Sequence, residues 1–167
     1  MKATELLKAQ HDETKRLFKA IESGKGDAVD QCEELADMLA AHMVIEQEIF
    51  YPAVLAADEN LVLEGYEEHA VARFALKRLM KIDDEDQTFQ AKVKTLKEII
   101  EHHVEEEEEE MFPKAETALG ERSEELCERM KMLFEKTVED GYEQTVGPGG
   151  TAVTSASARA VANHASS

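Results

Sequence analysis

Apolar residues recur every three or four positions along most of the chain, which is the period of a helix with one buried face. The pattern predicts five helices, over residues 4–22, 28–57, 61–82, 88–119 and 121–142. In the first of them the inward stripe consists of Leu7, His11, Thr14, Phe18 and Ile21. Asp27 is placed to cap the second helix. Because no alternating segment of useful length predicts a strand, the chain is expected to be all-α.

Two prolines and a change of composition divide this pattern. Pro52 and Pro113 fall inside predicted helices, and each should kink its helix because proline lacks a backbone N–H and clashes with the preceding turn. From Gly147 onward the sequence is rich in Ala, Ser, Thr and Gly. We therefore expect one domain over residues 1–146 and a flexible tail over residues 147–167, where His164 has no expected role.

Composition and charge exclude several classes of partner. The 167-residue chain has a net charge of −18, which repels nucleic acid and anionic lipid. No apolar run approaches the roughly 18 residues of a membrane span. The N-terminus lacks the basic start and apolar block of a secretory signal, so the cytoplasm is the expected compartment. Cys32 and Cys127 have no metal-site spacing and are expected to be reduced thiols.

An internal repeat carries the strongest signal. The segments from His42 to Pro52 and from His103 to Pro113 both read H-x-x-x-E-x-E-x-x-x-P. A helix with a single inward histidine precedes each copy, His11 in the first half and His69 in the second. The chain thus reads as two copies of one helical hairpin. Together they predict an up-down-up-down four-helix bundle, followed by a fifth helix.

The spacing of the repeat predicts a metal site. Residues four apart share one face of a helix, so the His and Glu of each copy can point at the same ions. Two such hairpins would bring four imidazoles and two carboxylates together inside the bundle. The candidate ligands are His11, His42, Glu46, His69, His103 and Glu107. This donor set suits iron, manganese or zinc, and carboxylates from opposite halves can each bridge two ions.

The alternative interpretation is that these are ordinary core histidines and surface helix pairs. Burying six such groups without compensation would cost many kcal/mol, since one unpaired buried charge alone costs several. His102 also has a glutamate four residues later. Only His103, however, has the same spacing to Pro113 that His42 has to Pro52. His102 is expected at the surface or behind the site. In the run of glutamates from 105 to 110, only Glu107 falls on the histidine face.

These motifs resemble the hemerythrin family, in its HHE cation-binding branch, over roughly residues 4 to 140. The resemblance implies a hemerythrin-like bundle whose six ligands are the residues named above, with Glu46 and Glu107 as the bridges. It also implies a non-haem di-iron centre, two iron ions joined by an oxo or hydroxo group. Zinc or manganese in place of iron remains open.

The sequence departs from the oxygen-carrying hemerythrins at two positions. Arg73 stands where those proteins have a fifth histidine, and Glu107 follows its histidine at four residues where they have an aspartate at five. Both departures resemble the four-histidine HHE-type proteins. Arg73 is expected at the surface, or as a donor to a bound anion. Tyr51 is a candidate extra contact, although ideal helix geometry turns it about 180° from His42.

The resemblance therefore implies a di-iron protein that binds or reduces a small oxidant: oxygen, hydrogen peroxide or nitric oxide. As an enzyme it would be a peroxide- or nitric-oxide-consuming oxidoreductase. The alternative is a non-catalytic oxygen or iron sensor, or an iron store, whose fifth helix or tail reports metal occupancy. A ferritin-like oxidase is disfavoured because it requires Glu-x-x-His pairs, which this chain lacks. No redox partner is identified by the sequence.

Overall fold

The computed structural model describes residues 1–146. Over that range helices are the only regular secondary structure. The α-helices are α1 (Ala3–Glu22), α2 (Ala28–Ile45), α3 (Tyr51–Val54), α4 (Glu59–Leu79), α5 (Phe89–Glu106), α6 (Phe112–Leu119) and α7 (Arg122–Thr145). Two π-helical turns, Glu46–Phe50 and Glu107–Met111, lie between them. The predicted tail and His164 fall outside the described residues. Among the helices described, none has both the length and the apolar character needed to cross a bilayer.

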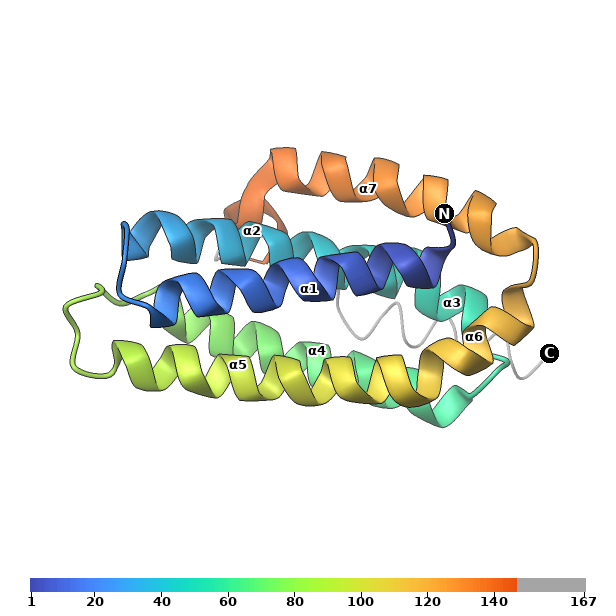
Figure 1. Cartoon of the computed structure of the whole chain (residues 1–167), viewed down its shortest axis with the longest axis horizontal. Helices are drawn as coiled ribbons and strands as arrows, with labels where there is room; N and C mark the ends of the chain where they lie inside the picture. The colour runs from blue at the N-terminus through green and yellow to red at the C-terminus, as the bar shows by residue number, and fades with distance from the viewer. Residues whose placement is uncertain (147–167) are drawn as a thin grey trace.

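Four long antiparallel helices form the bundle that the repeat predicts (Figure 1). α1 packs beside α2, and α4 packs beside α5, as the two hairpins. Contacts of α1 with α5 and of α2 with α4 close the bundle. α7 lies along the outer side of α2, which it contacts most extensively (Figure 1). The all-α bundle with a fifth C-terminal helix is thereby confirmed.

The core is divided into two apolar clusters with a buried polar layer between them. One cluster lies toward the hairpin turns of the bundle and includes Phe18, Leu35 and Leu96. The other lies toward the opposite end and includes Leu7 and Phe112. The four buried histidines belong to neither apolar cluster and form part of the polar layer between them. The apolar clusters therefore fix the helices on both sides of the candidate site.

Both long helices with an internal proline are interrupted, not simply kinked. The helix expected over residues 28–57 leaves α-helical geometry after Ile45 and regains it at Tyr51. The helix expected over residues 88–119 behaves in the same way around Glu107–Met111. Each π turn ends two residues before its proline. The wider backbone ring of the turn accommodates the residue that cannot donate a hydrogen bond. The extra residue in the turn shifts the register, so Tyr51 faces the interior and is fully buried.

Candidate metal centre

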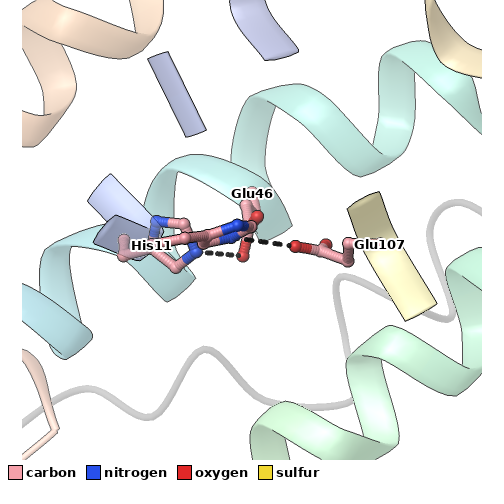
Figure 2. Close-up of side chains that lie close together, drawn as sticks. His11, Glu46 and Glu107 are labelled. Atoms are coloured by element: carbon pink, nitrogen blue, oxygen red, sulfur yellow. Dashed lines mark ion pairs between the residues drawn. The ribbon is translucent and has the colours of Figure 1, made fainter. Parts of the chain in front are cut away.

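Four helices bring the six sequence-predicted residues together in the interior of the bundle. His11 comes from α1, His42 from the last turn of α2, His69 from α4 and His103 from α5. The two glutamates, Glu46 and Glu107, open the two π turns. Each of the six is at most 4% exposed. Figure 2 shows His11, Glu46 and Glu107 converging from different elements.

The ligating atoms fall into two groups that share one glutamate. His11, His42, Glu46 and Glu107 form one group, and Glu46, His69 and His103 form the other. In both groups the ligating atoms lie within 4.8 Å of one another. Glu46 Oε2 is 3.3 Å from His42 Nε2 and 3.1 Å from His69 Nε2. Each group could hold one metal ion, and Glu46 is positioned to contact both ions.

Glu107 also spans the two groups. Its Oε2 atom lies 3.3 Å from His11 Nε2 and 3.6 Å from His103 Nε2. Glu46 and Glu107 come from opposite halves of the repeat, as the symmetry of the hairpins predicts. The two carboxylates therefore lie between the two pairs of imidazoles.

Several buried donor atoms at the centre have no hydrogen-bond partner among the described residues. They are Nε2 of His11, Nε2 of His42, both carboxylate oxygens of Glu46, Nδ1 of His69 and Oε2 of Glu107. An unsatisfied buried polar atom costs about 1–3 kcal/mol, so several in one place are unfavourable unless a ligand pairs with them. Nitrogen and carboxylate lone pairs directed at one point are the donors that a divalent or trivalent metal ion needs. The residues present therefore fit a metal cofactor.

Hydrogen bonds on the outer side hold three of the four imidazoles. The Nδ1 atoms of these histidines pair with side-chain oxygens: His11 with Glu108 at 2.8 Å, His42 with Gln10 at 2.8 Å, and His103 with Glu68 at 2.6 Å. These oxygens accept and Nδ1 donates, so Nε2 is the ring atom of each histidine that faces the centre. The sequence prediction missed these partners. The repeat does contain a signal for two of the partners, because Gln10 and Glu68 occupy equivalent positions, each directly before the single histidine of its half.

Burial and mutual charge separate the pKa values of the buried groups. Burial, together with the charge of Glu107, raises the pKa of Glu46 to about 8. Burial acts on Glu107 in the same direction, but the imidazoles of His103 and His11 outweigh it and hold the pKa of Glu107 below its usual range. Burial lowers the pKa of His42 and of His69 well below the ordinary histidine value. Those two imidazoles are therefore neutral, which is the form that binds metals.

Tyr51 is a member of the site that ideal helix geometry would have placed elsewhere. Its hydroxyl donates to Glu107 Oε1 at 2.9 Å and lies 3.3 Å from His69 Nε2. The π turn before Pro52 produces this orientation. The glycine at position 65 on α4 allows it, because a Cβ there would lie 2.7 Å from the Tyr51 hydroxyl oxygen. A larger residue at Gly65 would displace the tyrosine.

The aromatic neighbours of His11 and His69 differ by one hydroxyl group. Phe112 occupies the place of Tyr51 in the second copy of the repeat, directly before Pro113. The Phe112 ring stacks on His11 with a centroid distance of 5.7 Å, and the Tyr51 ring stacks on His69 at 5.4 Å. The aromatic packing is therefore symmetric, but only the side with His69 and His103 has a phenol.

Arg73 and His102 contribute from outside the centre. Arg73 is half-buried and donates from Nη1 to Gln47 Oε1 at 3.0 Å, so it steadies the π turn next to Glu46. Arg73 thus lies partly at the surface, one of the two positions expected, and its guanidinium contacts Gln47. The side chain of His102 is 64% exposed and lies 3.6 Å from Glu68 and 3.7 Å from Glu106. The expected position of His102 at the surface is confirmed. The two cysteines, Cys32 and Cys127, are free thiols and both are buried.

A small, mostly enclosed cavity lies against the histidines. Its walls are His11, Thr14, Leu39, His42, Met43, His69, Ile100, His103 and Val104. Its volume is about 10 Å³ for the centre of a water-sized molecule, enough for about one such molecule. Leu39, Met43, Ile100 and Val104 make part of the wall apolar, and the imidazoles form much of the rest, so the cavity suits a small molecule placed directly beside the imidazoles.

Comparisons with known proteins agree with this geometry. The family profile described as the hemerythrin HHE cation-binding domain matches residues 2–115. The crystal structure of a hemerythrin HHE cation-binding domain-containing protein from Mycobacterium kansasii is similar at 25% sequence identity and a TM-score of 0.75. The match covers 95% of this chain and 98% of that one. No curated protein matches the chain.

Proposed function

Because the chain belongs to the hemerythrin HHE cation-binding family, we propose that it is a non-haem di-iron protein that binds or reduces a small oxidant. Oxygen, hydrogen peroxide and nitric oxide are the candidate oxidants. The observation that carries the proposal is the pair of ligand groups sharing Glu46, beside a cavity that admits about one small molecule. A peroxide- or nitric-oxide-consuming oxidoreductase would use both features.

The donor atoms divide naturally between two ions. His11 and His42 would hold one ion, and His69 and His103 the other. Glu46 and Glu107 would bridge them, which would pair the buried atoms that have no partner in the protein. The family favours iron over manganese and zinc, which use the same donors. When bound, the iron pair supplies the electrons that reduce the oxidant.

The protein's own residues define where the oxidant binds and which protons are nearby. The apolar part of the cavity wall excludes bulk water and favours small molecules. Tyr51 holds its hydroxyl proton against Glu107, beside His69. Burial raises the pKa of Tyr51 well above its usual value, so the phenol stays protonated and acts as a hydrogen-bond donor. Arg73 donates to Gln47 and would supply no ligand to the metal.

One experiment separates this proposal from the sensor or store. The purified protein is loaded with ferrous iron, and its ultraviolet-visible spectrum is followed during repeated additions of oxygen, nitric oxide or hydrogen peroxide. Repeated consumption of peroxide or nitric oxide supports the oxidoreductase. A single stoichiometric oxidation, with no further change, supports the sensor or store instead.

The cavity volume predicts a size limit on the oxidant. We expect hydrogen peroxide to be consumed and tert-butyl hydroperoxide to be consumed at least about tenfold more slowly, because the cavity has room for about one water-sized molecule. Replacing Leu39 and Ile100, which line the cavity, by Ala should reduce the difference between the consumption rates of the two peroxides. Equal rates for the two peroxides in the wild-type protein would show that the reaction occurs outside the cavity.

A further inference from the structure

Met43 places a thioether in the wall of the oxidant cavity. It directly follows His42 in the chain, is 2% exposed to solvent, and lines the cavity together with the four imidazoles. A thioether sulfur is readily oxidised by peroxide. Bulk peroxide has poor access to a side chain this deeply buried, so Met43 would meet an oxidant only when one occupies the cavity.

The second half of the repeat shows that this wall does not require sulfur. Val104 follows His103 as Met43 follows His42, and Val104 lines the same cavity. Leu39 and Ile100 form a second matched pair, each three residues before its histidine. Three of these four positions thus carry plain hydrocarbon side chains. Met43 is the oxidisable exception.

We propose that Met43 is an oxidation site at which the protein limits its own reaction with peroxide; this rests on hydrogen peroxide being an oxidant that enters the cavity. The sulfur lone pair of Met43 attacks one peroxide oxygen, the S–O bond forms and the O–O bond breaks. The departing hydroxide takes the proton of the transferred hydroxyl and leaves as water. Sulfur loses two electrons and peroxide gains them, so no other reactant is needed.

The product would change the cavity. Methionine sulfoxide is larger and more polar than methionine, and the cavity holds only about one water-sized molecule. The sulfoxide oxygen would occupy the space in which the next oxidant binds. Oxidation of Met43 would therefore slow further reaction while the six metal-binding side chains remain unchanged.

Internal methionines supply the control for the test. Met111 and Met130 are 4% and 0% exposed, about as buried as Met43, and neither lines the cavity. Met132 is 73% exposed and reports the reaction with bulk peroxide. The metal-loaded protein is pulsed with hydrogen peroxide, and sulfoxide at each methionine is quantified by peptide mass spectrometry.

We expect sulfoxide to form at Met43 at least about fivefold faster than at Met111 and Met130. An equal or slower rate at Met43 would overturn the proposal. Peroxide consumption and metal content measured in the same samples test the proposed function separately, because oxygen transfer to sulfur needs peroxide alone. A Met43→Leu variant should lose its peroxide-consuming activity more slowly per turnover than a matched Met130→Leu variant; equal loss in both would also contradict the proposal.

Discussion

Replacement of His103 by Ala is expected to weaken metal binding by more than about 100-fold. His103 is 3% exposed, and its Nε2 atom lies 3.6 Å from Glu107 and 4.0 Å from Glu46. Loss of an outer hydrogen-bond partner of a metal ligand already reduces affinity by about 10–100-fold, so loss of the imidazole itself should have a larger effect. The measurement is metal content after dialysis against a graded series of chelator concentrations.

The neighbouring histidine provides a matched control. His102 is adjacent in the chain, also has a glutamate four residues later, and has an exposed side chain. His102 also lies with Glu68 and Glu106 in a third, more exposed group of possible ligands. A His102→Ala variant should nevertheless keep the metal of the buried centre. If both variants lost metal to the same extent, the assignment of His103 from the register of the repeat would be wrong. Circular dichroism of the metal-free variants checks that both fold.

Metal loading is expected to raise the melting temperature by about 10 °C. A ligand that binds only the folded state at about 1,000 times its dissociation constant adds about 4 kcal/mol to the free energy of unfolding. For a domain of this size each kcal/mol is worth about 2–4 °C. The structural reason is that buried atoms of His11, His42, Glu46 and Glu107 have no partner among the described residues and would gain one. Thermal unfolding with and without chelator measures the shift.

A Glu46→Ala variant supplies the control for the thermal experiment. Glu46 belongs to both ligand groups, so its loss should remove most of the metal-dependent shift. A Glu48→Ala variant removes a nearby carboxylate of the same π turn that belongs to neither group, and should keep the full shift. An unchanged melting temperature on loading the wild-type protein would mean that metal does not bind the buried cluster.

Periodicity and the repeat were sufficient to predict the bundle and the six buried residues. His42 with Glu46 and His103 with Glu107 share helix faces because they are four residues apart, and both pairs point inward as expected. The repeat also selected His103 over the adjacent His102. These features depend only on the spacing of residues along single helices, which can be read directly from the sequence.

The parts that sequence analysis missed depend on local backbone geometry and on contacts between helices. Tyr51 faces the site because the backbone before Pro52 forms a π turn, which changes the register that an ideal helix would give. Its approach also depends on Gly65, fourteen positions later on another helix. The pairing of Glu68 with His103 likewise joins α4 to α5. Helical periodicity contains no information about such approaches.

The number of metal ions per chain tests the proposed dinuclear centre most directly. Ferrous iron is titrated into metal-free protein without oxygen, and bound metal is measured by elemental analysis after removal of the excess. The two ligand groups that share Glu46 predict two ions per chain, with both lost together in the Glu46→Ala variant. Binding of one ion or none to the wild-type protein would contradict a dinuclear site formed by these six residues.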